Sequence, residues 1–173
     1  YSLTGQINSP APFEATGLEV DKLDGDAVRR YMTHYLSIFQ DIMDEQKVEA
    51  GLNALLTDSI EAGPANWTPD IPAHFEALRG YNLMSWLPAL TGEIVGSREQ
   101  SEQFLNDYRR TLAELVATEH YGTVAEVAHE FGLVVYGESL EGNRIVSTLG
   151  DEMEMRRFAD IPMAAMWSWD KRS

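Results

Sequence analysis

Apolar residues recur every three or four positions in three stretches of the chain, which predicts three helical segments. The first runs to about residue 46, and the strongest runs from about residue 102 to 131. A shorter piece covers residues 74–78 and ends at Gly80, and Gly122 is expected to break or bend the longest helix. The periodic positions are Val28, Met32, Tyr35, Leu36, Phe39 and Met43 in the first segment, and Phe104, Tyr108, Leu112, Leu115 and Val116 in the longest.

Short apolar runs and alternations predict four strands. The expected strands lie at residues 16–23, 52–57, 133–136 and 158–163. The runs at 52–57 and 133–136 are apolar almost throughout, which is typical of parallel strands buried on both faces. Gly132 precedes the third run, at a place where a helix ends in a left-handed residue.

The order of strand, helix, strand, helices and strand indicates a parallel sheet with helical crossovers. About four strands with crossover helices make half of a (β/α)8 barrel, which takes about 250 residues. The 173 residues are therefore too few to close one. Part of such a barrel is the first expectation for this α/β chain, and a doubly wound sheet is the second. Because the chain begins without a starter Met, we expect it to be an excerpt of a longer polypeptide.

The charge balance narrows the classes of partner. The chain has 28 Asp and Glu against 13 Lys and Arg, a net charge of −15, so we expect no binding to nucleic acid or to anionic membrane surfaces. No apolar run reaches the roughly 18 residues of a membrane span. Cysteine is absent, which excludes disulfides and thiolate chemistry. The sequence also has no phosphate-binding glycine loop, nucleophile elbow or metal-like histidine spacing.

Acidic residues follow three of the expected strands. Asp21 comes with Lys22 at the first, Asp58 with Glu61 at the second, and Glu138 at the third. The carboxyl ends of parallel strands share one edge, where ligands bind. Glycoside hydrolysis requires two carboxyl groups across one bond, one as acid and the other as base or nucleophile. In a chain with 28 acids, the alternative is that solvated surface carboxylates fall there by chance.

Trp67 lies in the loop after the second expected strand, next to Asn66. Its ring is suited to stack on the apolar face of a sugar. The alternative is that the ring packs the loop, and the sequence favours neither.

Six blocks, in order along residues 9–167, resemble bacterial glycoside hydrolase family 106, the α-L-rhamnosidases. The blocks are Gly17–Leu23, Asp58–Gly63 with Asn66–Pro69, Arg79–Tyr81, Asp107–Thr111, Tyr136–Ser139 and Ala159–Met163. The resemblance implies a large multi-domain enzyme, with residues 1–173 as part of its catalytic (β/α)8 barrel. It also implies inverting hydrolysis of terminal α-L-rhamnose from polysaccharides or glycosides, a calcium ion near the sugar, and a periplasmic or secreted location.

The resemblance further implies roles for individual residues. Asp58 and Glu61 match the family's acidic pair, with Glu61 as the general acid, and Glu138 matches a position near the substrate. The other positions implied to bind substrate are Asp21, Lys22, Asn66 and Trp67. Metal ligands stay unassigned.

One position departs from the family pattern. After residues 161–163 the family has Gly-Glu-Phe-Trp, whereas this chain has Ala164-Ala165-Met166-Trp167. If the missing acid is the water-activating base, Ala165 marks an engineered change, a natural loss, or a transfer of the role to Glu138. The expectations are therefore a rhamnosidase, a catalytically inert sugar-binding relative, or a hydrolase of another deoxy or acidic sugar on the same scaffold.

Overall fold

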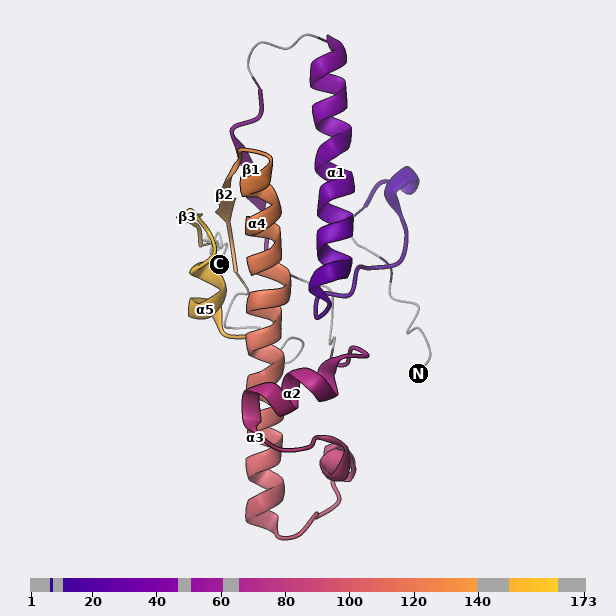
Figure 1. Ribbon diagram of the computed structural model, residues 1–173, viewed down its shortest axis with the longest axis vertical. Helices are drawn as coiled ribbons and strands as arrows, with labels where there is room; N and C mark the ends of the chain where they lie inside the picture. The colour runs from indigo at the N-terminus through magenta and orange to yellow at the C-terminus, as the bar shows by residue number, and fades with distance from the viewer. Residues whose placement is uncertain (1–6, 8–10, 47–50, 61–65, 140–149, 165–173) are drawn as a thin grey trace, which may run out of the picture.

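The computed structural model describes residue 7 and residues 11–46, 51–60, 66–139 and 150–164. Within these residues the chain has a mixed α/β fold, in which a three-stranded sheet lies beside two long helices (Figure 1). The helices are α1 (Gly25–Gln46), α2 (Ile71–Arg79), α3 (Arg98–Leu115), α4 (Thr123–Glu130) and α5 (Glu152–Arg156). The other elements are the 3₁₀ helices η1 (Phe13–Ala15) and η2 (Met84–Thr91), the π-helix η3 (Val116–Gly122), and the strands β1 (Ala54–Thr57), β2 (Val134–Gly137) and β3 (Ile161–Pro162).

The first predicted helix is confirmed as α1. The Asp24 carboxylate accepts the N–H of Ala27 at 3.0 Å, which satisfies one of the donors that a helix leaves open in its first turn. Apolar residues of α1 pack against α4 and the sheet in a cluster that we call the sheet core. Its buried members are Val28, Met32, Leu36, Val124, Ala125, Val127, Ala128, Leu133 and Val135.

The long predicted helix is one continuous rod made of α3, η3 and α4, and it contributes to two cores (Figure 1). α3 begins after Ser97, whose hydroxyl accepts the N–H of Gln100. It packs in a second cluster, the distal core, with buried members Leu23, Ile60, Ile71, Phe75, Leu83, Ala89, Phe104, Tyr108, Leu112, Leu115, Val116, Ala117, Tyr121 and Met155. The wider π turn of η3 rotates the buried stripe, so that α4 packs in the sheet core instead.

Gly122 does not break this helix, so of the two predicted effects, a break or a bend, the break is wrong. It has helical backbone angles (φ −60°, ψ −50°) at the end of η3. A Cβ at this position would lie 3.2 Å from the ring of Phe158, so any other residue would require that ring to shift, and glycine fits here by close packing. Gly80 and Gly132 behave as predicted, because each follows a helix with positive φ, 80° and 74° respectively.

The three strands run parallel in the order β1, β2, β3, which confirms the predicted parallel sheet with helical crossovers. Leu56 of β1 lies opposite Tyr136 of β2, which in turn lies opposite Ile161 of β3. The chain between β1 and β2 contains α2, η2, α3, η3 and α4, and the chain between β2 and β3 contains α5. A closed barrel remains a prediction, because three strands form only an open sheet.

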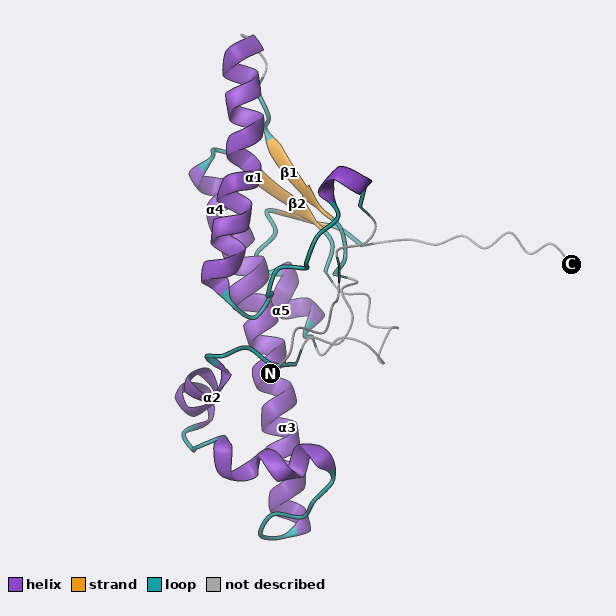
Figure 2. Ribbon diagram, turned by 90° about the vertical axis from the view of Figure 1, so that its right-hand side faces the viewer, coloured by secondary structure: helices purple, strands orange, loops and turns teal. Residues whose placement is uncertain are grey.

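The two strands predicted to be buried on both faces are buried on one. Exposure alternates along β1 and β2, because α1 and α4 cover a single face of the sheet (Figure 2). On the other face Leu56, Tyr136 and Ile161 lie side by side and are 61 %, 38 % and 50 % exposed. An apolar run is buried on both faces only where a second layer is present. Within the described residues this face is open.

The first expected strand, residues 16–23, is not a strand. Leu18 forms an isolated antiparallel bridge with Ile7. The chain then turns at Asp21, whose carboxylate accepts the N–H of Leu23 at 2.9 Å. Such a local side-chain hydrogen bond competes with strand pairing. The described residues therefore hold three strands rather than about four, and α5 is a helix that the apolar pattern does not predict.

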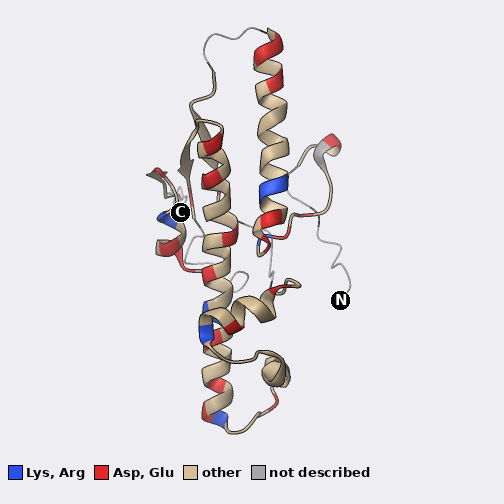
Figure 3. Cartoon of the chain, viewed as in Figure 1, with Lys and Arg blue, Asp and Glu red and all other residues tan. Residues whose placement is uncertain are grey.

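Acidic residues lie along α1, α3 and α4, and basic residues are fewer (Figure 3). This distribution follows from the excess of 28 acids over 13 bases in the sequence. None of the helices within the described ranges is long and apolar enough to cross a membrane.

Asp160 ties the start of β3 to β2 and α4. Its Oδ2 accepts the N–H of Val135 at 2.7 Å and lies 2.8 Å from Nε2 of His129. The hydrogen bond with His129, followed by the one from the Val135 amide, lowers the pKa of Asp160 below its ordinary value of 3.8. Folding therefore stabilises the ionised carboxylate.

We expect Asp160→Asn to lower the melting temperature at pH 7 and to lower it much less at pH 3. A carboxyl group with a lowered pKa contributes stability above its unfolded-state pKa of about 4, and this contribution is lost as pH falls through the folded-state value. Thermal unfolding between pH 3 and pH 7 measures the effect, with Glu93→Gln as an exposed control. An equal loss across this range would show that the charge of Asp160 is not involved.

Candidate active site at the carboxyl edge of the sheet

The carboxyl ends of β1 and β2 bring Asp58 and Glu138 side by side. Thr57 pairs with Gly137, and the N–H of Glu138 donates to the carbonyl of Thr57 at 3.0 Å. The two acids are therefore the next residues in register. Alternation along the strands places both positions on the same face as Leu56, which is the open face of the sheet.

Local contacts hold this edge in place. The Thr57 hydroxyl occupies the space that a Cβ at Gly137 would need, so β1 and β2 approach closely at their ends. The Asp58 carboxylate accepts the N–H of Ser59 at 2.7 Å. Behind Glu138, the buried hydroxyl of Ser139 accepts a hydrogen bond from Nε of Arg156 in α5 at 2.9 Å. The backbone that carries the two acids is thus fixed on both sides.

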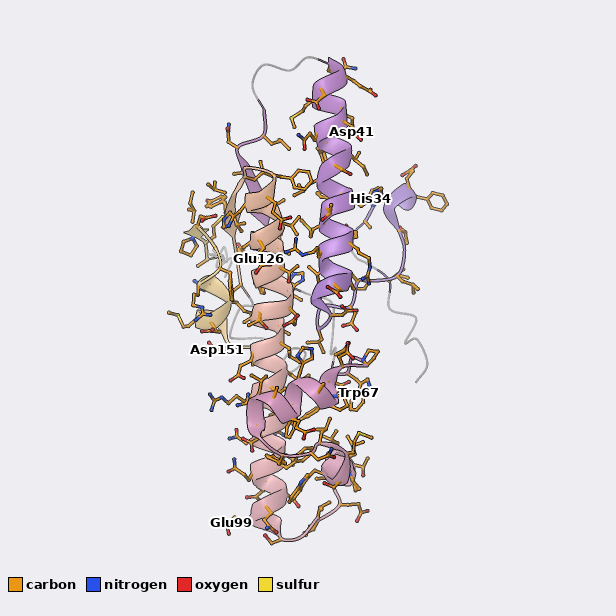
Figure 4. The ribbon with its side chains drawn as sticks, viewed as in Figure 1. His34, Asp41, Trp67, Glu99, Glu126 and Asp151 are labelled. Atoms are coloured by element: carbon orange, nitrogen blue, oxygen red, sulfur yellow. The ribbon has the colours of Figure 1, made fainter. Side chains whose placement is uncertain are left out.

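Asn66 and Trp67 lie just before α2, where Figure 4 labels Trp67. The carbonyl of Asn66 accepts a hydrogen bond from the hydroxyl of Tyr108 at 2.5 Å, which anchors this loop to α3. The Trp67 ring is half-buried and packs against the distal core. The ring therefore has a packing role, and part of its surface is exposed.

We expect Trp67→Ala to lower kcat/KM for a sugar substrate by about tenfold, which corresponds to the loss of a stacking contact worth about 1–1.5 kcal/mol. The melting temperature should also fall, because the ring packs on the distal core. Trp67→Phe is the matched control, since it keeps an aromatic face. Unchanged kinetics with a lowered melting temperature in Trp67→Ala would leave only the packing role.

Asp21 and Lys22 lie before α1, and they are not on the strand edge that carries Asp58. The Asp21 carboxylate closes the turn described above, and the Lys22 ammonium forms an ion pair with Glu19. Lys22 lines a cavity of about 130 Å³ together with Leu18, Glu19, Val20, Val28, Tyr31, Met32 and His120. Burial, and secondly the charge of Lys22, lower the pKa of His120 to about 3, so this imidazole is neutral.

The π-helix η3 contains two polar side-chain atoms that the sequence analysis did not single out. Within the described residues, Oη of Tyr121 and Nδ1 of His120 are buried without a hydrogen-bond partner. Helical periodicity cannot reveal such positions, because a π turn shifts which residues face inward.

The remaining predicted site residues, Glu61 and Ala165, lie outside the described residues. In the sequence, Glu61 follows β1 by four residues, and position 165 follows β3 by three. Their assignment stays a prediction from the family resemblance.

A calcium site has no support within the described ranges. No three Asp, Glu or His side chains there converge as ion ligands. The cavity of about 360 Å³ at the start of α1 is acidic, with lining residues Leu23, Asp24, Gly25, Asp26, Arg29, Asp70, His74, Glu119, Thr123 and Glu126. Asp24 caps α1 and Glu126 bonds Arg29 at 2.7 Å, so these two acids already have protein partners. We therefore assign calcium no ligands and no step.

Comparison with known proteins relates this chain to glycoside hydrolases. The profile of the family described as alpha-L-rhamnosidase matches residues 1–173. A solved rhamnosidase structure from Novosphingobium sp. PP1Y is 60 % identical, with a TM-score of 0.88 over 96 % of this chain and 16 % of that chain. A protein of Formosa agariphila, named provisionally as a beta-glucuronidase, is 40 % identical over 170 residues, which are 97 % of this chain and 14 % of that protein.

The chain spans less than one fifth of the length of either relative. The match of the family profile nevertheless extends over the entire chain, and the rhamnosidase structure shares its fold. The chain belongs to glycoside hydrolase family 106, the α-L-rhamnosidase family.

Proposed function

We propose that the polypeptide carrying this chain is a glycoside hydrolase that releases terminal α-L-rhamnose from polysaccharides or glycosides, with inversion at the anomeric carbon. Family membership and the 60 % identical rhamnosidase support the substrate class. The proposal includes a periplasmic or secreted location, where such carbohydrates are met. It includes no nucleic-acid or membrane partner, in keeping with the net charge of −15.

The observation that carries the proposal is the pair of acids at neighbouring carboxyl ends of a parallel sheet. Asp58 and Glu138 follow β1 and β2 in register, and Ser139 and Arg156 fix the backbone behind Glu138. Ligands of parallel α/β folds bind at this edge. Carboxylates there accept hydrogen bonds from sugar hydroxyls and can act in proton transfer.

Strand spacing supports an assignment of acid and base. In inverting enzymes the two carboxyl groups are about 6.5–9.5 Å apart, which leaves room for water. Neighbouring strands lie only about 4.8 Å apart. The backbones of Asp58 and Glu138 are therefore closer together than the acid and base of an inverting enzyme. β2 separates β1 from β3, so the backbones at the ends of these two strands are about 9.6 Å apart, near the upper limit of that range. We therefore propose Glu61, which follows β1 in the sequence, as the acid and position 165, which follows β3, as the place of the base.

In this mechanism Glu61 protonates the departing glycosidic oxygen as its bond to the anomeric carbon breaks. A carboxylate on the opposite side of the ring removes a proton from the water that attacks this carbon. Asp58 and Glu138 bind the sugar between the two. Because position 165 is Ala, the water-activating step is expected to be slow in this chain.

The name of the Formosa agariphila relative motivates a second candidate, a β-glucuronide substrate. A uronic acid adds a carboxylate that needs a cationic partner. The described strand edge carries Asp58 and Glu138, and its nearby cation, Arg156, already donates to Ser139. This acidic edge favours the neutral rhamnose.

A panel of 4-nitrophenyl glycosides tests the proposed function. The full-length polypeptide, as it exists and with Ala165→Glu, should cleave the α-L-rhamnoside in preference to the β-D-glucuronide and to other deoxy-sugar glycosides. NMR of the first product should show the inverted anomer. Preferential cleavage of the glucuronide would overturn the substrate assignment. Rhamnose binding without cleavage in both proteins would support an inert sugar-binding relative.

A further inference from the structure

Three contacts hold the backbone at the end of β2, where Glu138 lies. On the β1 side, the N–H of Glu138 donates to the carbonyl of Thr57 at 3.0 Å. On the β3 side, the N–H of Met163 donates to the carbonyl of the residue before Glu138 at 2.8 Å. The third contact comes from a side chain, because Nε of Arg156 in α5 donates to the hydroxyl of Ser139 at 2.9 Å. Elements on both sides of β2 and the helix α5 therefore meet at this short segment.

Glu138 and Ser139 face opposite sides of the sheet. Burial alternates along β2 and continues past its end, so that Ser139 is buried and Glu138 is half-buried. Ser139 is only 1 % exposed and has the same alternation as Val135, which packs in the sheet core. Successive side chains of an extended strand point to opposite faces. A contact that fixes the Ser139 side chain on the covered face therefore also sets the direction in which Glu138 leaves the backbone, toward the open face.

The helix that carries Arg156 is itself anchored. The carboxylate of Asp151, labelled in Figure 4, accepts two N–H groups of the first turn of α5 at 3.0 and 3.1 Å. Met155 is 1 % exposed and belongs to the distal core. Phe158, just after α5, packs against both the distal core and the sheet core. The guanidinium of Arg156 therefore extends to Ser139 from a fixed support.

Stability alone does not require a hydrogen bond at this place. Two apolar side chains of similar shape could replace a buried hydroxyl and its charged partner at little cost in folding free energy. A hydrogen bond differs from an apolar contact in that it has a preferred direction as well as a preferred distance. The ion pair of Arg156 with Glu152 is long, at 3.8 Å, whereas the bond to Ser139 is 2.9 Å. The specific contribution of Arg156 is therefore the orientation of the segment at Ser139.

We propose that Arg156 is a positioning residue: its hydrogen bond to Ser139 holds the end of β2 so that the Glu138 carboxylate is directed to the open face as an acceptor for sugar hydroxyls. This role rests on the function proposed above, in which Glu138 binds the sugar. Binding groups act fully only when neighbouring contacts hold them close to the productive geometry. Loss of the Arg156–Ser139 bond should therefore weaken sugar binding through Glu138.

The test measures the affinity of the full-length polypeptide for L-rhamnose by calorimetry, because binding does not depend on the base at position 165. Ser139→Ala removes the acceptor, and Arg156→Met removes the donor from a residue whose side chain is 28 % exposed. Each variant should bind rhamnose about tenfold more weakly, the size expected when a hydrogen bond to a charged group is lost. The double variant should bind no more weakly than either single variant, because both substitutions remove the same bond.

The Glu138→Gln background separates positioning from a general loss of structure. If Arg156 and Ser139 act on the sugar through the Glu138 carboxylate, Ser139→Ala should cause no further loss of affinity once this carboxylate is gone. A merely structural contribution would lower the affinity by the same factor in both backgrounds. An equal fall in both backgrounds would therefore overturn the positioning role.

Thr111→Val is the matched control. Nε of Arg79 donates to the buried hydroxyl of Thr111 at 2.9 Å, so this substitution removes a bond of the same kind on α3 rather than on the sheet. Its melting temperature should change, whereas its rhamnose affinity should not. Unchanged affinity in both Ser139→Ala and Arg156→Met, or in Glu138→Gln, would overturn the positioning role while the proposed function stands. Absence of rhamnose binding in the unchanged polypeptide would overturn both.

Discussion

Replacing Glu61 by Gln is expected to lower kcat for an alkyl α-L-rhamnoside by about 10²–10⁴-fold, the range that general acid catalysis contributes. The amide keeps the shape of the carboxyl group but cannot deliver a proton to the departing oxygen. Rhamnose affinity should be retained, so the loss should appear in kcat rather than in KM. Steady-state kinetics and calorimetry of the full-length polypeptide measure the two quantities, preferably in the Ala165→Glu background, for which we expect the higher turnover.

Comparing substrates with different leaving groups distinguishes the general acid from the other carboxylates of the site. A 4-nitrophenolate leaves without protonation, so Glu61→Gln should impair cleavage of the nitrophenyl rhamnoside far less than cleavage of the alkyl rhamnoside. Asp58→Asn is the matched control, because it removes the other acid of the same sequence pair. If Asp58→Asn shows the dependence on the leaving group and Glu61→Gln does not, the acid is Asp58.

Replacing Ala165 by Glu is expected to raise kcat on the α-L-rhamnoside by about 10²–10⁴-fold, because a carboxylate able to activate water is regained. In the sequence, position 165 follows β3, a strand that β2 separates from β1, and an inverting site needs a gap for water between its acid and its base. Steady-state kinetics of the two proteins measure the gain.

Ala165→Gln controls for the size of the new side chain and should give no gain. Azide added to the Ala165 protein should restore part of the turnover, because a small anion can attack where the water is no longer activated. If the Ala165 protein already turns over near the median enzyme kcat of about 10 s⁻¹, then Glu138 or another acid supplies the base.

Much of the helical structure could be predicted from local patterns. α1, α2 and the rod of α3 to α4 follow apolar residues spaced by three or four, because each helical turn is closed within a few residues along the chain. Gly80 and Gly132 ended helices as predicted for the same local reason. The parallel order of the three strands also followed, since helical segments between apolar runs require crossovers.

The candidate site could be predicted in part. The sequence indicates Asp58 and Glu138 because each follows an apolar run, and the register of β1 with β2 makes them neighbours. The burial of Tyr121 could not be predicted from the sequence, because it depends on a π turn and on a core that includes Ile60, which lies 61 residues earlier in the chain. Asp21 and Lys22 stay predicted near the substrate from the family resemblance, and the structure places Asp21 in a turn and Lys22 beside the His120 cavity.

The sequence by itself determined the α/β class, the positions of the main helices and the acids that follow β1 and β2. Only the tertiary structure determined which strand faces are covered, that residues 16–23 form a turn with one bridge, and that one helix contributes to two cores. The physical reason is the range of the interactions. Helical hydrogen bonds and caps join residues close in sequence, whereas the exposure of Leu56 and the burial of Tyr121 depend on elements brought together from distant parts of the chain.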